Sequence, residues 1–184
     1  MTGFLFSLMS LFKKNPDIET AHALYADTIL AARRPELFTE MGVPDTPEGR
    51  FEMLALMAFL VLRRLKSDDT ARDVAQAYFD VMFEDIDSNL RELGVGDISV
   101  GKKVKRLAES FYGRIKAYEE ALAANDNNEL YRTLARHPYR NMEPAELNLE
   151  RLARQIRDED AHLATQDMAA LLSGKITFCS IQPA

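Results

Sequence analysis

Apolar residues recur at the spacing of an α-helix over two adjacent stretches, and this periodicity limits the possible folds more than any other feature. A short turn with two glycines, 93–97, joins the stretches. Two striped helices with so short a link are expected to pack as an antiparallel hairpin, here over 71–124. The stripes are Tyr78, Met82, Ile86, Leu90 and Leu93, then Val100, Val104, Leu107, Phe111, Ile115, Tyr118 and Leu122.

Helix signals also fill the rest of the chain. Asn15-Pro16 and Thr46-Pro47 both combine an N-cap residue with a proline at the first helical position. The stretch after Thr46-Pro47 is apolar nearly all round, which predicts the most buried helix. Strand-like alternation is not evident. We therefore expect an all-α, single-domain bundle of about six helices around the central hairpin. The predicted helices are 15–34, a short turn at 36–41, 48–66, the hairpin pair, 129–136 and 144–174.

The domain is predicted to occupy 15–178, between an apolar and basic tail at 1–14 and a C-terminal tail at 179–184. A chain of 184 residues with 47% hydrophobic residues is large enough for one real core. A net charge of −6 gives no general attraction for nucleic acid, so no DNA partner is expected. The single cysteine, Cys179, cannot form an internal disulfide, which fits a reducing compartment.

Membrane association is the open question for the N-terminal tail. A membrane-spanning helix needs about 20 consecutive apolar residues. The stretch 51–62 is interrupted by Glu52, and the stretch 4–12 is short and followed by its basic residues, the wrong order for a signal peptide. We expect a soluble cytoplasmic protein. Peripheral contact of 1–14 with the inner face of the cytoplasmic membrane is the alternative to a loose tail.

Two Glu-x-x-His pairs raise the possibility of a metal site. Glu19 with His22 and Glu159 with His162, plus spare glutamates elsewhere, are the ligand types of a ferritin-like di-metal carboxylate site. The apolar stripe of the last helix places Glu159 and His162 at its edge, however. We expect surface or flanking residues and no metal, and metal analysis of the purified protein would separate the two interpretations.

Catalysis is not expected, and neither is a cofactor. The stretch 96–103 is one residue short of a P-loop: Lys103 stands where Ser or Thr is required, and a helix precedes the loop instead of a strand. The acidic helix face at 80–87 has no histidine or lysine pattern that would tune it for acid–base work. No Ser–His–Asp or Cys–His arrangement can be argued either.

Three features of the hairpin suggest a binding surface. Cations are disfavoured at a helix N-terminus by a few tenths of a kcal/mol each, yet the second helix begins with Lys102, Lys103, Lys105 and Arg106. Gly113 in mid-helix costs about 1 kcal/mol relative to alanine, and such a glycine often admits another backbone or a ligand. Tyr112 lies just off the stripe and is predicted to be exposed. For Phe83 and Phe111, which lie on the stripe, burial is the first expectation.

Several ordered motifs resemble the ubiquinol–cytochrome c chaperone family over roughly 21–178. They are the acidic helix and turn at 79–96, the stretches 100–105 and 111–114, the Pro-Asp-Thr-x-x-Gly-Arg-Phe segment within 42–53, and 61–65. The resemblance implies a chaperone that binds newly made cytochrome b before and during its incorporation into respiratory complex III. Mitochondrial members work beside the ribosome with a small partner protein. No mitochondrial presequence is recognisable, so we expect a bacterial member.

The resemblance and the hairpin features together predict the binding residues. An anionic partner is expected at Lys102, Lys103, Lys105 and Arg106, and Arg50 and Phe51 belong to the entry motif. A helical interaction module with another client remains the second alternative to the chaperone interpretation. The predicted client-binding residues are Phe79, Asp80, Met82, Phe83, Asp87, Arg91, Phe111, Tyr112, Arg114 and Tyr118.

Overall fold

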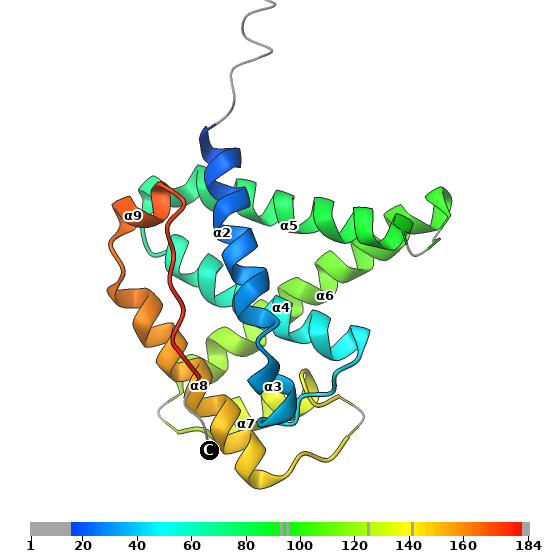
Figure 1. Ribbon diagram of the computed structural model, residues 1–184, viewed down its shortest axis with the longest axis vertical. Helices are drawn as coiled ribbons and strands as arrows, with labels where there is room; N and C mark the ends of the chain where they lie inside the picture. The colour runs from blue at the N-terminus through cyan, green and yellow to red at the C-terminus, as the bar shows by residue number, and fades with distance from the viewer. Residues whose placement is uncertain (1–15, 93, 95, 125, 141, 182–184) are drawn as a thin grey trace, which may run out of the picture.

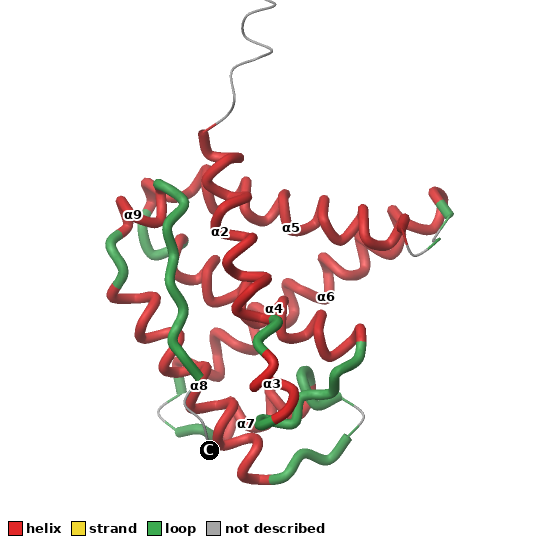
Figure 2. The backbone as a smooth tube through the Cα atoms, in the orientation of Figure 1, coloured by secondary structure: helices red, strands yellow, loops and turns green. Residues whose placement is uncertain are grey.

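The computed structural model describes residues 16–181, except 93, 95, 125 and 141. These residues form helices and loops without a strand, which confirms the all-α, single-domain prediction (Figures 1 and 2). In chain order the elements are α2 (Pro16–Ala32), α3 (Pro35–Thr39), α4 (Pro47–Leu65), the 3-10 turn η1 (Asp69–Ala71), α5 (Arg72–Glu92), α6 (Asp97–Ala123), α7 (Asn128–Arg136), α8 (Glu146–Thr165) and α9 (Met168–Leu172).

Helix α4 lies at the centre of the molecule, as its sequence predicts. The Thr46 hydroxyl accepts a hydrogen bond from the Gly49 N–H at 3.1 Å and so caps the helix start. Every residue from 55 to 62 is buried. A glycine is required at position 49, because a Cβ there would lie 2.0 Å from the Pro44 carbonyl oxygen. This close approach fixes the loop that leads into α4.

Helices α5 and α6 form the predicted hairpin. They meet at their linked end, which projects from the body, and diverge toward the core (Figure 1). The partner that α5 contacts most extensively is α2 rather than α6. At that contact the Tyr78 hydroxyl donates to Thr28 Oγ1 at 2.9 Å, and the Tyr25 hydroxyl donates to Asp85 at 2.9 Å. Helix α5 is therefore held in place by α2 as well as by its hairpin partner α6.

The prediction of one continuous last helix over 144–174 is wrong. The segment forms two helices, because Gln166 is extended and the Asp167 side chain caps α9 through the Ala169 N–H. Arg64 of α4 donates to the carbonyl oxygens of Leu163 at 2.9 Å and Gln166 at 2.6 Å, and so satisfies the end of α8. After Gly174, which has a positive φ of 79°, the chain returns along α8 in an extended conformation (Figure 1).

Two large apolar side chains at helix starts do not face the core. Ile18, in the first turn of α2, is 44% exposed, and Leu147, in the first turn of α8, is 61% exposed. The helical period continues through these first turns, but within the described part of the chain no packed surface covers the two side chains.

Candidate functional site: a groove beside the helical hairpin

A groove of about 450 Å³ lies between the end of α4, the start of α5 and the middle of α6. Its apolar lining comes from all three helices, and charged residues of the α4–α5 connection form its rim. Of the residues predicted to bind the client, Phe79 and Tyr112 line this groove. The lining residues are Leu62, Lys66, Asp68, Asp69, Arg72, Ala75, Gln76, Phe79, Tyr112 and Ile115.

Phe79 is the centre of an aromatic cluster that continues from the groove into the core. Its ring stacks on Tyr112 with centroids 5.5 Å apart, and lies 4.7 Å from Phe83 and 6.1 Å from Phe111. Tyr112 is 57% exposed, which confirms the prediction that it stands off the buried stripe. A rigid aromatic side chain, supported from below and open above, is well suited to contact a partner.

The rim of the groove carries both signs of charge. Hydrogen bonds from the Thr70 hydroxyl and N–H lower the pKa of Asp68, which is therefore ionised near neutral pH. Arg72 pairs with Asp69 at 3.0 Å, and Lys66 is exposed. Next to the groove, the Gln76 amide donates to Asp80 at 2.8 Å. Asp80 thus lies beside the groove, and its contact with a client stays a prediction.

Five predicted client-binding residues belong to the core instead. Their burial gives them a packing role in this conformation, and it corrects their assignment to direct contact. Phe83 and Phe111 follow their first expectation, which is burial on the stripe. The five are Met82, 2% exposed, Phe83, 8%, Phe111, 1%, Arg114, 6%, and Tyr118, fully buried.

Arg114 is buried because it pairs with Glu52 of α4. Its Nε donates to Glu52 Oε2 at 2.7 Å, its Nη2 donates to the other carboxylate oxygen, and both side chains are 7% exposed. Hydrogen bonding to Glu52 raises the pKa of Arg114. The guanidinium also lies over the Phe51 ring, 5.7 Å from its centroid. This ion pair joins the segment 42–53 to the segment 111–114, and sequence reasoning missed it.

Arg50 of the entry motif contacts the loop that precedes α4. The exposed guanidinium pairs with Asp45 at 2.5 Å and lies over the Phe38 ring at 5.9 Å. The ion pair raises the pKa of Arg50 and lowers that of Asp45. Arg50 is therefore placed to fasten the loop before α4, on the opposite end of that helix from the groove.

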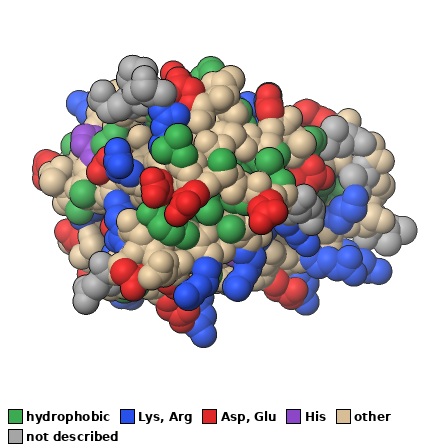
Figure 3. Space-filling view, turned by 90° about the horizontal axis from the view of Figure 1, so that it is seen from below, with side chains coloured by type: hydrophobic (Ala, Val, Ile, Leu, Met, Phe, Trp, Pro, Cys, Tyr) green, Lys and Arg blue, Asp and Glu red, His purple; other side chains and the backbone are tan. Residues whose placement is uncertain are grey.

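The basic cluster, Lys102, Lys103, Lys105 and Arg106, is exposed along the first turns of α6. In the space-filling view from below, Lys and Arg side chains gather toward the right-hand edge, the side on which the α5–α6 tip lies in Figure 1 (Figure 3). Lys105 precedes Tyr112 by two helical turns, so the two share a face of α6 about 10 Å apart. Lys105 pairs with Glu109 one turn further along α6, at 4.0 Å.

Gly113 and the pair Asp87–Arg91 complete the predicted surface. A Cβ at Gly113 would have no heavy atom within 4 Å outside its own turns of helix, so no other segment of the described chain occupies the space that the glycine leaves open. Asp87 and Arg91 lie one turn apart on α5 and pair at 2.5 Å. Contact with a partner remains a prediction for these residues, for Phe79, Asp80 and Tyr112, and for the basic cluster.

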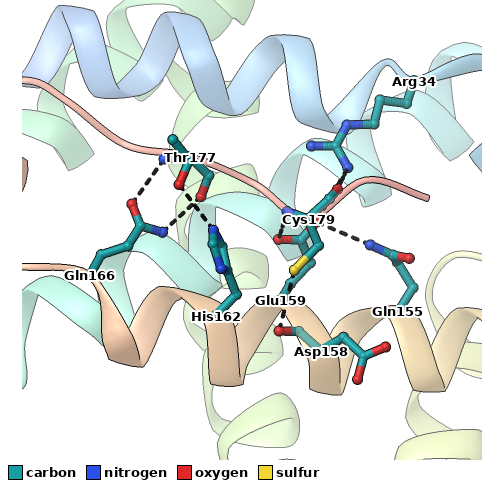
Figure 4. A network of polar contacts seen from close by, with 8 residues as sticks. All are labelled: Arg34, Gln155, Asp158, Glu159, His162, Gln166, Thr177 and Cys179. Carbon is teal, nitrogen blue, oxygen red and sulfur yellow. Dashed lines mark hydrogen bonds and ion pairs between the residues drawn. The ribbon is translucent and has the colours of Figure 1, made fainter. Parts of the chain in front are cut away.

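The two Glu-x-x-His pairs do not converge on one site. Glu159 is fully buried, so the prediction that it is a surface or flanking residue is wrong. Its carboxylate accepts hydrogen bonds from Arg34 at 3.3 Å and from Gln155 at 3.1 Å (Figure 4). His162 contacts Thr177 at 3.0 Å, and His22 is exposed. In the part of the chain that the structure describes, no three His, Cys, Asp or Glu side chains are grouped as metal ligands.

Over the same described ranges, no helix is both long enough and apolar enough to cross a membrane. Helix α4, which carries the apolar stretch 51–62, contains Glu52 and ends with Arg63 and Arg64. The N-terminal tail, 1–14, for which lipid contact is expected, lies outside the described residues.

Comparison with known proteins gives consistent relatives. Ubiquinol-cytochrome-c reductase complex assembly factor 1 of Xenopus laevis is 24% identical over 147 residues, 78% of this chain and 72% of that protein. The Mus musculus protein of the same name is 24% identical over 157 residues, 83% of this chain but only 52% of the relative, so the chain spans about half the length of that relative. The crystal structure of the Cbp3 homolog from Brucella abortus superposes with a TM-score of 0.81 at 35% identity, over 98% of both chains.

The family assignment covers the hairpin, the groove and the buried Glu52–Arg114 pair. The family model for the ubiquinol–cytochrome c chaperone matches residues 39–178, which is most of the chain. The matched region runs from the loop before α4 to the extended segment after α9. By this match, the chain belongs to the ubiquinol–cytochrome c chaperone family.

Proposed function

We propose that this protein is an assembly chaperone that binds newly made cytochrome b and promotes its incorporation into ubiquinol–cytochrome c reductase. The family match and the names of the curated relatives support the assembly role. The observation that carries the binding role is the groove with Tyr112 stacked on Phe79. An exposed aromatic pair above an apolar lining is suited to hold apolar side chains of another polypeptide away from water.

The chemistry of the groove fits a membrane-protein client. Segments destined for the bilayer are strongly apolar and must be shielded from water until they insert. The apolar lining residues, among them Leu62, Phe79 and Ile115, offer a surface for such a segment. The open space beside Gly113 allows a client backbone to approach α6 closely. Phe79 and Tyr112 are the anchors in this proposal, and Asp80 contacts the flank of the bound segment.

The basic cluster on α6 has a separate part in the proposal. Four exposed cations on one end of a helix attract an anionic partner over a Debye length of about 8 Å at physiological salt. The ribosome, or the small partner protein implied by the family resemblance, is proposed to approach here. Charges of this kind act mainly on the rate and the salt dependence of association. Lipid contact through 1–14 remains a prediction.

The direct test is capture from native membranes. A tagged full-length chain should enrich cytochrome b, and Tyr112→Ala should reduce the enrichment. Leu30→Ala is a matched control, because Leu30 is 70% exposed on α2, outside the groove. Enrichment of an unrelated protein in place of cytochrome b would support the alternative of a helical interaction module with another client.

A further inference from the structure

Residues 175–181 follow α9 as an extended segment that lies against α8 (Figures 1 and 4). Ile176 is 7% exposed and packs in the core. Phe178 is half-buried, and its ring lies under the guanidinium of Arg34 at 5.9 Å. The segment thus points alternate apolar side chains into the body, as a strand on a packed surface does.

The polar contacts of this segment are made mostly by its main chain. The Gln166 side chain brackets Thr177: its amide nitrogen donates to the Thr177 carbonyl at 2.8 Å, and its oxygen accepts from the Thr177 N–H at 2.9 Å. Two residues on, the Cys179 N–H donates to Glu159 at 2.9 Å, and Arg34 donates to the Cys179 carbonyl. The side chains of Glu159 in α8, of Gln166 at the end of α8 and of Arg34 therefore take the place of a neighbouring strand, at the two-residue period of a strand.

The groups that hold the main chain are built into the body of the protein. The Glu159 carboxylate is fully buried and is also held by Arg34 and Gln155. A buried carboxylate needs such donors, and a main-chain N–H from an extended segment is one of them. Among the described residues, the side chains of the segment add two polar contacts, His162 with Thr177 at 3.0 Å and the Cys179 thiol with the Asp158 carbonyl at 3.6 Å. Recognition of this kind depends little on sequence.

We propose that the surface formed by Arg34, Gln155, Glu159 and Gln166 is a binding site for an extended apolar polypeptide segment, which residues 175–181 occupy as an internal ligand. The external ligand is an extended client segment with apolar residues at alternate positions. A chaperone that meets its client before it folds gains from main-chain recognition, because any such segment satisfies it. The site shares no lining residue with the Phe79–Tyr112 groove. Only the identity of the client rests on the proposed function.

The test uses the full-length protein and a fluorescent peptide with the sequence of residues 174–184, carrying Cys179→Ser. In the wild-type protein the tethered segment competes with the peptide at an effective concentration in the millimolar range. The double variant Ile176→Ser/Phe178→Ser weakens the tethered segment without changing the site. We expect this variant to bind the peptide about tenfold more tightly than the wild type does, or more.

Two further peptides and two variants define the mode of binding. A peptide N-methylated at the amides of residues 177 and 179 should bind at least about tenfold more weakly, because it lacks both main-chain donors. A peptide with Ile176→Val and Phe178→Leu should bind as well as the parent. In the double-variant background, Gln166→Ala should weaken binding, whereas the matched control Gln76→Ala, in the other groove, should not.

The proposal would be overturned if the N-methylated peptide bound as tightly as the parent peptide. It would also be overturned if the double variant kept its helical circular dichroism but did not bind the parent peptide. If the double variant does not fold, the single variant Phe178→Ser, which changes only a half-buried side chain, is used with excess photo-reactive peptide: cross-links to α8 support the site, and their absence overturns it. A wild-type dimer that exchanges the C-terminal segment would show that the occupant is a second copy, and would overturn the client assignment. None of these results depends on cytochrome b capture, so the two proposals fail separately.

Discussion

The ring of Phe79 on α5 supports the ring of Tyr112 on α6, with centroids 5.5 Å apart and planes inclined by 29°. Phe79 also contacts Phe83 and Phe111 in the core, so the exposed tyrosine rests on a buried aromatic cluster. A supported side chain loses little conformational entropy when a partner covers it. This relationship makes Tyr112 the strongest candidate anchor of the groove.

Tyr112→Ala should therefore weaken client binding by about 1–3 kcal/mol and change thermal stability little. The reason is that the ring is 57% exposed and the cluster beneath it remains complete. Client affinity and Tm should be measured on the same samples, with Leu30→Ala as the control. A lower Tm with unchanged client affinity would show that Tyr112 is a packing residue and that the binding site lies elsewhere.

Reversing Lys102, Lys103 and Lys105 to glutamate should slow association and flatten its dependence on salt. These side chains are exposed, so the fold should be retained. Charges at the edge of an interface act on encounter more than on release. Stopped-flow or surface binding at several salt concentrations measures both effects. Lys116→Glu, also exposed on α6, is the matched control; an equal effect of that variant would rule out a specific role for the cluster.

Arg114→Met should destabilise the fold by about 3–5 kcal/mol, because it leaves the Glu52 carboxylate buried without its partner. Both side chains are 7% exposed. The double variant Glu52→Leu/Arg114→Met removes both charges and should recover much of the loss. Urea unfolding measures the free energies. As a control, Arg50→Met breaks the exposed Arg50–Asp45 ion pair and should have a small effect on stability. If Arg114→Met and the double variant lost the same amount of stability, a buried unpaired charge would not be the cause.

Stability should fall as pH falls below about 6.5, the ordinary pKa of histidine. Burial lowers the pKa of His137, with Arg114, Arg136 and Arg140 acting in the same direction and Glu52 against it. Below pH 6.5 the unfolded chain therefore binds the proton first, so the contribution of His137 is complete above that pH and is lost toward the lower folded pKa.

The measurement is urea unfolding between about pH 6.5 and 5, a window above the ordinary pKa of aspartate. His137→Gln should reduce the slope of stability against pH in this window. A slope identical to that of the wild type would assign the pH dependence to other groups.

Periodicity predicted most of the elements, because the stripes of α4, α5 and α6 are long and face a common core. It also predicted the exposure of Tyr112, which lies one residue off a buried stripe. It failed where distant residues decide the structure. Glu159 is at the edge of the stripe of α8, yet Arg34 and the main chain of Cys179 bury it.

The break between α8 and α9 has the same kind of cause. Arg64 of α4 donates hydrogen bonds to the carbonyl oxygens at the end of α8, and the Gln166 side chain accepts a hydrogen bond from the Thr177 N–H. The Glu52–Arg114 pair spans 62 positions of sequence and is equally invisible to local patterns. A glutamate within a helix that is apolar nearly all round was the available signal, because a buried carboxylate needs a partner.

Site-specific photo-cross-linking from Tyr112 to newly synthesised cytochrome b tests the central claim most directly. A photo-reactive residue at position 112 of the full-length chain should give a cross-link to cytochrome b during its synthesis, whereas one at position 30, on α2, should not. Cross-links at position 112 to cytochrome b would place the client in the groove. Cytochrome b that is captured by the chain but cross-linked equally from both positions, or from neither, would contradict the assignment of this groove as the client site.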